Sequence, residues 1–406
     1  MRPREIAAMI GLRPPSRRGP VARRLARCHD IDDLRAAARR RLPGPVFDYV
    51  DGGADDETSL ERNREAFRRI AFHPRTLVDV SGTDPSTTLL GRAQPLPMVL
   101  APTGYSRMMH PDGEQGVARA AARAGLPYTL STVASTSIED VAATGHPARW
   151  FQLYLWRDRD MVADLVRRAQ AHGYGVLEVS VDVPVSGLRR RDVRNGLTIP
   201  PQLTARTLAS ILSRPSYWIG MVRSPAVTFA NAPPSVDGSG GVTIENMSAQ
   251  FDPSVDWADV EALRRQWPGR LLVKGPLSPD DARRALEAGA DGVHLSNHGG
   301  RQLDRIVPPI RTVPAVRAAL GPDATIVVDS GIRHGADVVA AVALGADAGA
   351  IGRAYLYGLM AAGEPGVDHA LALLAAQVRR TMQLLGVTSV AELRERGPEL
   401  VVLDRA

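Results

Sequence analysis

The feature that most constrains the fold is an alternation that begins near residue 97 and continues to about residue 351. Short apolar runs rich in β-branched and aromatic residues predict strands, and helical patterns rich in Ala, Leu and Arg lie between most of them. Eight such runs occur, at Met98–Ala101, Pro127–Leu130, Trp150–Tyr154, Val176–Val181, Leu271–Lys274, Gly292–Leu295, Thr325–Val328 and Ala348–Ile351. Several of the helical patterns end at a glycine, such as Gly125 or Gly289, which favours a helix end.

Eight strands alternating with helices favour an α/β fold, the closed (β/α)8 TIM barrel, over an open doubly wound sheet. No Gly-x-Gly-x-x-Gly follows the first strand, which argues against a dinucleotide-binding fold. Barrels of this kind use about 250 residues or more as one domain. We therefore expect a single barrel domain over residues 31–390, a basic mobile extension over 1–30 and a C-terminal tail over 391–406.

Two segments stand outside the alternation. Before the barrel, residues 31–42 and 57–69 predict an N-terminal helical extension. After the fourth strand, the interval from Val183 to about Asp259 is too long for one loop and one helix, so we expect an insertion over about residues 190–255. Its part from 203 to 222 places apolar and aromatic side chains beside arginines, which fits an interfacial helix or a lid and subunit-packing segment.

Charge and cysteine usage restrict the partners. The net charge is +6, and residues 1–41 hold twelve arginines against four acids, a pattern open to a solvated arm, a subunit contact or an anionic membrane. No nucleic-acid-binding motif accompanies this arm, so no nucleic acid partner is expected. Cys28 is the only cysteine, which excludes an intrachain disulfide. We expect a cytoplasmic protein, with a peripheral contact at the inner face of the cell membrane left open.

The active site of a (β/α)8 enzyme lies at the C-terminal ends of its strands. In this chain those ends carry polar residues or glycine, and we expect them to converge. They are Ala101, Pro102, Thr103 and Gly104, then Ser131, Gln152 and Tyr154, Ser180 and Asp182, Lys274, Ser296, His298 and Arg301, Asp329 to Arg333, and Gly352 and Arg353. No metal is expected, because the acidic run from Asp51 to Glu57 fits the solvated start of a helix.

Chemistry can be assigned to several of these ends. Loops after the last two strands commonly bind phosphate, so Gly331, Arg333, Gly352 and Arg353 predict a phosphate-bearing substrate or cofactor. The hydroxyl and amide groups of the earlier ends suit a planar ring rich in heteroatoms. Lys274 is the only lysine among many arginines, and a compact ammonium would stabilise a ring that becomes anionic, as a flavin does on reduction.

The turn from Ser296 to Asp304 supplies a candidate catalytic pair. His298, with Asp182 as its orienting carboxylate, is a candidate base for a hydroxyl proton. Arg301 is a candidate clamp for a substrate carboxylate. An alternative from another class is a flavin-free (β/α)8 isomerase or aldolase that acts on a phosphorylated substrate.

The segment Ser296–Asp304 resembles the FMN-dependent L-2-hydroxy-acid dehydrogenase/oxidase family. The resemblance is also carried by Trp150–Tyr154, Ala101–Gly104, Val273–Gly275 and Asp329–Arg333, and it extends over about residues 31–390. Within the family the chain is most similar to bacterial L-lactate dehydrogenases that pass electrons to a quinone or cytochrome. The resemblance implies an FMN cofactor, oxidation of L-lactate to pyruvate and a homotetramer.

The resemblance also implies roles for individual residues. It makes His298 the base, Asp182 its partner, Lys274 the group that offsets the charge of the reduced flavin, and Arg301 and Arg189 the carboxylate ligands. Tyr49 and Tyr154 would hydrogen-bond the substrate; the roles of Tyr49 and Arg189 rest on the resemblance alone. FMN would be held by Ala101, Pro102, Thr103, Ser131, Gln152, Ser180, Lys274, Ser296, Asp329, Gly331, Arg333, Gly352 and Arg353.

Two positions bear on alternatives within the family. Gly104 stands where oxidases of the family often have alanine, which favours an acceptor other than oxygen over an oxidase that makes hydrogen peroxide. Val133 is smaller than the aromatic side chain found there in some relatives, so it would admit a bulkier substrate, as in a mandelate-type dehydrogenase.

Overall fold

A closed barrel of eight parallel strands forms the centre of the protein, as the alternation predicts. The computed structural model describes residues 19–196, 210, 212–231 and 249–403. Going round the barrel, the strand order is β10-β11-β4-β5-β6-β7-β8-β9. Each strand lies within one residue of the run that predicted it: β4 Met98–Leu100, β5 Tyr128–Ser131, β6 Arg149–Tyr154, β7 Val176–Ser180, β8 Arg270–Gly275, β9 Gly292–Leu295, β10 Thr325–Val328 and β11 Ala348–Ile351.

Side chains of the barrel strands alternate between two separate apolar clusters, because successive residues of a strand point to opposite faces. One cluster lies between the strands and the helices and includes Leu177 and Val273. The other includes Trp150, Val176 and Leu272, whose side chains point to the opposite face of their strands and fill the barrel interior. Towards the C-terminal ends the interior positions become polar, and this change places a site at the mouth of the barrel.

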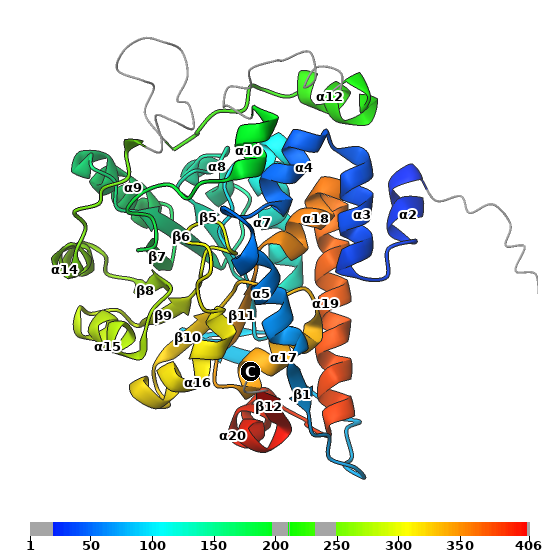
Figure 1. Cartoon of the computed structure of the whole chain (residues 1–406), viewed down its shortest axis with the longest axis vertical. Helices are drawn as coiled ribbons and strands as arrows, with labels where there is room; N and C mark the ends of the chain where they lie inside the picture. The colour runs from blue at the N-terminus through cyan, green and yellow to red at the C-terminus, as the bar shows by residue number, and fades with distance from the viewer. Residues whose placement is uncertain (1–18, 197–209, 211, 232–248, 404–406) are drawn as a thin grey trace, which may run out of the picture.

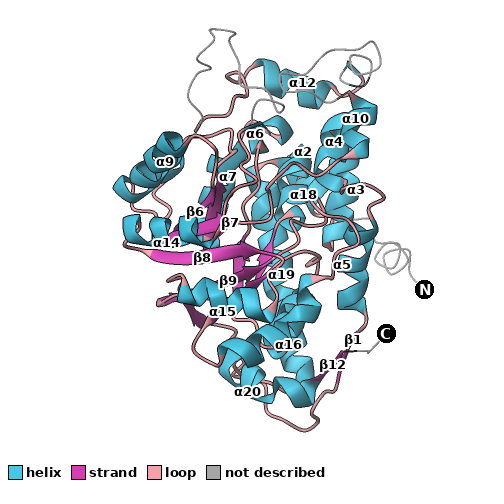
Figure 2. Cartoon of the chain, turned by 60° about the vertical axis from the view of Figure 1, so that its left-hand side comes forward, coloured by secondary structure: helices cyan, strands magenta, loops and turns pink. Residues whose placement is uncertain are grey.

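Helices cover the outside of the barrel (Figure 1, Figure 2). Their bounds are α6 Ser106–Met109, α7 Gly113–Ala124, α8 Ile138–Ala142, α9 Arg159–Ala171, α14 Trp257–Gln266, α15 Pro279–Glu287, α16 Pro309–Leu320, α17 Gly335–Ala343 and α18 Arg353–Ala362. They are followed by the long helix α19 Glu364–Leu385, which packs against α18 and α17. Figure 1 shows α19 beside α18 and α3.

The N-terminal extension contains four described helices, α2 Pro20–Leu25, α3 Ile31–Arg41, α4 Gly44–Asp51 and α5 Thr58–Arg68. The helices predicted over 31–42 and 57–69 are α3 and α5, whereas α4 was not predicted. Helix α3 packs on α18, and α5 packs on α16, so the extension is part of the barrel's outer layer. Residues 1–18 of the expected basic extension lie outside the described residues.

The segment that leads into the barrel pairs with the C-terminal end of the described chain. Strand β1 (Ile70–Phe72) pairs antiparallel with β12 (Val401–Leu403), close to the C-terminus marked in Figure 1. A hairpin of β2 (Thr87–Leu89) and β3 (Arg92–Gln94) contributes Leu89 to the interior cluster. Helix α20 (Val390–Leu400) packs on α17, so the segment expected as a C-terminal tail includes packed elements.

The insertion after β7 contributes α10 (Arg190–Asn195) and α12 (Pro215–Val222), and residues 197–209, 211 and 232–248 lie outside the described part. Figure 1 shows α12 at one end of the molecule, beyond α4 and α10. Tyr217 anchors α12 by donating to the carbonyl of Met108 at 2.9 Å, while Ile219 and Val222 are exposed. None of the described helices has the length and apolar character needed to span a membrane.

Candidate active site

A cavity of about 200 Å³ opens at the C-terminal mouth of the barrel. Most of the predicted site residues line it. They are Tyr49, Ala101, Pro102, Thr103, Ser131, Gln152, Tyr154, Ser180, Arg189, Lys274, His298, Arg301, Asp329, Gly331, Arg333, Gly352 and Arg353. Asp182 and Ser296 do not line the cavity; both contact His298 from outside it.

His298 is held as a base that faces the cavity. Its Nδ1 lies 3.1 Å and 3.2 Å from the two carboxylate oxygens of Asp182. Although burial opposes ionisation, His298 and Lys274 hold the pKa of Asp182 below its ordinary value. Because an ionised carboxylate only accepts hydrogen bonds, Nδ1 carries a hydrogen, and in the neutral imidazole the lone pair is on Nε2. The Tyr154 hydroxyl lies 3.4 Å from Nε2.

The backbone of the turn also positions His298. His298 has a φ of 58°, in the left-handed region, and the glycines at 299 and 300 continue with φ of 65° and 74°. The backbone N–H of His298 donates to the hydroxyl of Ser296 at 3.0 Å. Ser296 therefore supports the histidine directly, which is a different contact from the flavin contact that the resemblance implies.

Two guanidinium groups face the ring of Tyr49. The central carbon of Arg301 lies 5.0 Å from the ring centroid and that of Arg189 lies 5.6 Å from it. Arg301 donates to the backbone carbonyls of Tyr49 at 2.6 Å and Gly52 at 3.2 Å, and no described carboxylate is ion-paired with it. Burial and then the charge of Arg189 lower the pKa of Arg301. A ligand carboxylate between the arginines would form charge-assisted hydrogen bonds with both.

The loops after β10 and β11 form a second anion site. Arg353 is buried and donates to the carbonyls of Val50 at 2.7 Å, Gly52 at 2.7 Å and Gly299 at 2.9 Å, and it has no ion pair in the described part of the chain. Burial and then the charge of Arg301 lower the pKa of Arg353 to about 9. Arg353 also begins α18, whose N-terminus attracts anions. This end of the cavity fits a phosphate group.

Buried polar atoms between the two anion sites fit a heteroatom-rich ring. The Ser180 hydroxyl and the Gln152 Nε2 are buried without a hydrogen-bond partner among the described residues. Lys274 is 3% exposed. Burial lowers its pKa, but Asp182 and Asp329 outweigh burial and raise that pKa, so the ammonium stays charged. FMN would supply both the ring and the phosphate that these groups require.

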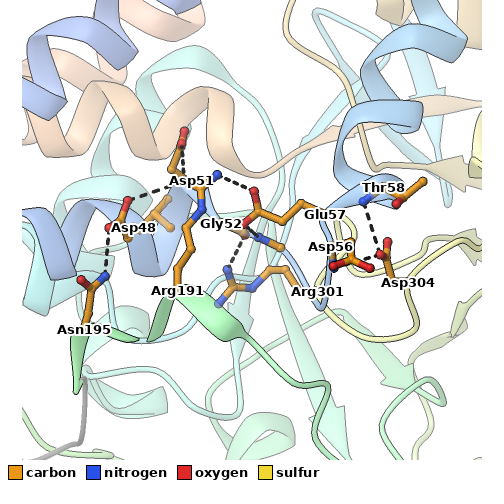
Figure 3. Close-up of polar contacts among 12 residues, drawn as sticks. Asp48, Asp51, Gly52, Asp56, Glu57, Thr58, Arg191, Asn195, Arg301 and Asp304 are labelled. Carbon is orange, nitrogen blue, oxygen red and sulfur yellow. Dashed lines mark hydrogen bonds and ion pairs between the residues drawn. The ribbon is translucent and has the colours of Figure 1, made fainter. Parts of the chain in front are cut away.

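The predicted turn also joins the barrel to helix α5. The side-chain amides of Asn297 and Asn63 donate to each other at 2.7 Å and 2.8 Å. The carboxylate of Asp304 accepts from the backbone N–H of Ser59 at 2.7 Å, and also from those of Asp56 and Thr58 (Figure 3). Unpaired N–H groups at a helix start favour such a partner. The turn therefore fixes both the histidine and the helix packed on it.

Helix α10 is fastened to α4 and to the start of α5 by arginines. Arg191 pairs with Asp51 at 3.4 Å and with Glu57, and Asn195 donates to Asp48 at 2.9 Å (Figure 3). Arg190 pairs with acids at the start of α5. The acidic run expected as a solvated helix start is therefore paired with arginine. These pairs hold Arg189, the residue just before α10, at the cavity.

Some cavity residues were not predicted from the sequence. Gln302 lies inside the predicted turn and donates to the carbonyl of Asp182 at 2.9 Å, so its place in the motif was an available signal. Phe229 and Phe251 come from the insertion, where no motif indicated them. Phe251 packs edge-on against Tyr154, with ring centroids 5.4 Å apart, and narrows the cavity.

Comparison with known proteins identifies relatives over nearly the whole chain. Residues 38–399 match the family model described as FMN-dependent dehydrogenase. A putative L-lactate dehydrogenase of Mycobacterium tuberculosis is 50% identical over 92% of this chain and 90% of its own length. An L-lactate dehydrogenase of Caulobacter vibrioides is 44% identical over 89% and 95%.

Mandelate-specific relatives are similar as well. The (S)-mandelate dehydrogenase of Pseudomonas putida is 41% identical over 90% of this chain and 92% of its length. A crystal structure described as the monotopic membrane protein (S)-mandelate dehydrogenase has a TM-score of 0.88 and 39% identity, covering 93% of this chain and all of that one. These matches confirm the predicted resemblance, the barrel and FMN as cofactor, and they give the flavin-free alternative no support.

The contact between the turn and α5 can be tested by measuring the free energy of unfolding. Replacing Asp304 with alanine removes the acceptor of the N–H groups that begin α5, and we expect a loss of about 1–2 kcal/mol in unfolding free energy. Urea unfolding of the holoenzyme measures it. The control is Asp280→Ala, an exposed acid in the first turn of α15, which should cost under about 0.5 kcal/mol. Equal losses in both variants would contradict this role of Asp304.

Proposed function

Because the chain belongs to the FMN-dependent dehydrogenase family, we propose that it oxidises L-lactate to pyruvate and passes the electrons to a quinone or a cytochrome. The observation that carries this proposal is the arrangement of His298 and Arg301 in one cavity. A base supported by Asp182 faces the space beside Arg301, which has no ion pair in the described part of the chain, and Arg189, whose carboxylate partner Asp192 lies 3.6 Å away. A 2-hydroxy acid offers the hydroxyl and the carboxylate that these groups require.

The proposed reaction assigns one task to each residue. Arg301 and Arg189 bind the substrate carboxylate, and Tyr49 and Tyr154 hydrogen-bond the bound substrate. His298 Nε2 takes the hydroxyl proton, and the resulting imidazolium is stabilised by Asp182. Bound FMN would supply the acceptor for the two electrons of the Cα–H bond that is broken. These residues are compatible with loss of the Cα hydrogen either as a hydride or as a proton.

Lys274 has a separate task in this scheme. The Lys274 ammonium is buried and lines the cavity, and it would offset the negative charge that a bound flavin gains on reduction. A guanidinium would present a planar fork instead of a compact charge. This requirement accounts for the single lysine in a chain whose other permanently cationic side chains are arginines.

A mandelate-type substrate is the second candidate, and Val133 favours it. Val133 lines the cavity next to Gly104, where an added Cβ would approach the Val133 side chain to 2.6 Å. A small side chain at 133 leaves room beside the reacting carbon for a larger substituent. The named mandelate relatives support the same possibility. Gly104, in turn, supports an acceptor other than oxygen, in line with the family pattern.

We also propose a peripheral attachment to the inner face of the cell membrane and a homotetramer. The exposed side chains of Ile219 and Val222 on α12 support the attachment, together with the arginines of the N-terminal arm. The crystal structure described as a monotopic membrane protein has the same overall fold. The tetramer rests on the family resemblance.

The role of His298 is tested by His298→Gln. Glutamine has a similar size but cannot take a proton, so kcat/KM for L-lactate should fall by about 10²–10⁴ while the flavin absorbance is retained. Steady-state assays with a dye acceptor measure this loss. His172→Gln, at the end of α9, is the control and should keep wild-type activity. Normal turnover in His298→Gln would exclude it as the base.

The substrate pocket is tested by Val133→Phe. The larger side chain should lower kcat/KM for (S)-mandelate relative to L-lactate by about tenfold or more, because it occupies the space of the phenyl group. The matched variant Val133→Ala should shift the ratio the other way. If both variants leave the ratio unchanged, Val133 does not set substrate width.

The membrane proposal is tested by sedimentation with lipid vesicles. The protein should sediment with vesicles that contain anionic lipid and be released by high salt, which screens exposed charges. The double variant Ile219→Ser/Val222→Ser should bind more weakly, since it removes apolar contacts. Equal sedimentation with purely zwitterionic vesicles, or unchanged binding of the variant, would argue against the proposed attachment surface.

A further inference from the structure

The barrel interior below the cavity contains a histidine between two carboxylates. His294 on β9 is fully buried. Its Nδ1 lies 2.8 Å from Oε2 of Glu178 on β7, and its Nε2 lies 3.2 Å from Oδ2 of Asp329, which follows β10. The second contact has the geometry of an ion pair rather than of a linear hydrogen bond. The reaction scheme above uses neither His294 nor Glu178.

The contacts of His294 indicate an imidazolium. A neutral imidazole has one N–H, so one of its nitrogens would direct a lone pair at a carboxylate oxygen. Both ring nitrogens of His294 face such oxygens, and a hydrogen on each removes the repulsion. Burial lowers the pKa of His294, but Glu178 and Asp329 outweigh burial and raise it to about 9. At neutral pH the ring therefore carries a positive charge.

The strand register places this charge beside Lys274. His294 and Lys274 are register partners on the neighbouring strands β9 and β8, so their backbones lie side by side. Glu178 is two residues deeper along its strand than Ser180, the partner of Lys274, which is a separation of about 7 Å along the barrel. Asp329 acts on both cations, because its charge raises the pKa of Lys274 as well as that of His294.

We propose that His294 is a buried cation that offsets the charge of Asp329 and thereby leaves the charge of Lys274 available to the flavin. Lys274 would otherwise face three carboxylates, those of Asp182, Asp329 and Glu178, which together exceed its charge. With His294 charged, two cations face these three acids, so the excess of negative charge around Lys274 is smaller. His294 is thus a positioning residue whose effect on FMN passes through Asp329 and Lys274, and its removal makes reduction of the flavin less favourable.

The proposal predicts a shift in the midpoint potential of bound FMN. A unit charge about 10 Å away at an effective dielectric constant of about 20 changes an equilibrium by about tenfold. Tenfold corresponds to about 30 mV for a two-electron couple. The His294→Gln holoenzyme should have a potential lower by about this amount, and His294→Lys, which keeps a cation, should restore most of it.

The His294→Gln variant leaves Glu178 buried without a cation, which can prevent folding, so a second variant removes both charges. Glu178→Gln/His294→Gln replaces both charges with amides, and its potential should still fall, because the removed cation lies nearer the cavity than the removed acid. The matched control is Glu139→Gln/Arg168→Gln, which removes an ion pair between α8 and α9. Its potential should equal that of the wild type.

The pH dependence of stability gives a readout that does not involve the flavin potential. The groups that face His294 are Glu178 from β7, Asp329 after β10 and Lys274 from β8. A histidine whose pKa is raised from 6.5 to about 9 stabilises the fold below pH 6.5, and this stabilisation is lost as the pH rises through 9. The Tm of the wild-type holoenzyme should fall more steeply over this interval than that of Glu178→Gln/His294→Gln.

Two results would overturn the proposal. One is a wild-type potential in both His294→Gln and the double variant, and the other is parallel Tm curves in the wild type and the double variant. The inference rests on the proposed role of Lys274 but not on the substrate. Since potentials and Tm values are measured without any hydroxy acid, failure here is distinguishable from failure of the proposed lactate oxidation.

Discussion

The active site depends on hydrogen bonds that connect helix α4 to the barrel. Arg301 and Arg353 donate them to carbonyls at the C-terminal end of α4 and to the carbonyl of the residue after it. Helix α4 lies outside the barrel, and the last carbonyls of any helix lack intrahelical partners and carry partial negative charge. The two arginines satisfy these carbonyls without losing their own net charge. The same contacts therefore bring Tyr49 to the cavity and leave two cations ready for ligand anions.

Charge balance connects the barrel interior to the proposed chemistry. At the mouth, arginines exceed acids, which suits a ligand with a phosphate and a substrate with a carboxylate. Deeper inside, the charges of Asp182 and Asp329 act on Lys274, and His294 lies between Asp329 and Glu178 above the apolar bottom of the barrel. Each acid has a cation within reach, which lets a buried site hold charge without unfolding the strands around it.

The barrel was predictable because its signal is local. Strand and helix patterns repeat along the chain, and a general rule places function at the strand ends, so the cavity residues on the barrel followed from the sequence. Tyr49 and Arg189 were found only through family resemblance, because they come from an outer helix and from the insertion. The partnership of Glu178 with His294 was missed since each sits in an otherwise apolar strand. Their contact appears only in the closed barrel, where β7 and β9 lie on either side of β8 and both direct these side chains inward.

Anaerobic mixing of the holoenzyme with L-lactate tests the central claim most directly. The flavin absorbance should bleach with L-lactate and not with D-lactate, and a quinone should restore it faster than air. A flavin that remains oxidised in the presence of L-lactate would contradict the proposed function. Faster restoration by air than by the quinone would contradict the proposed electron acceptor.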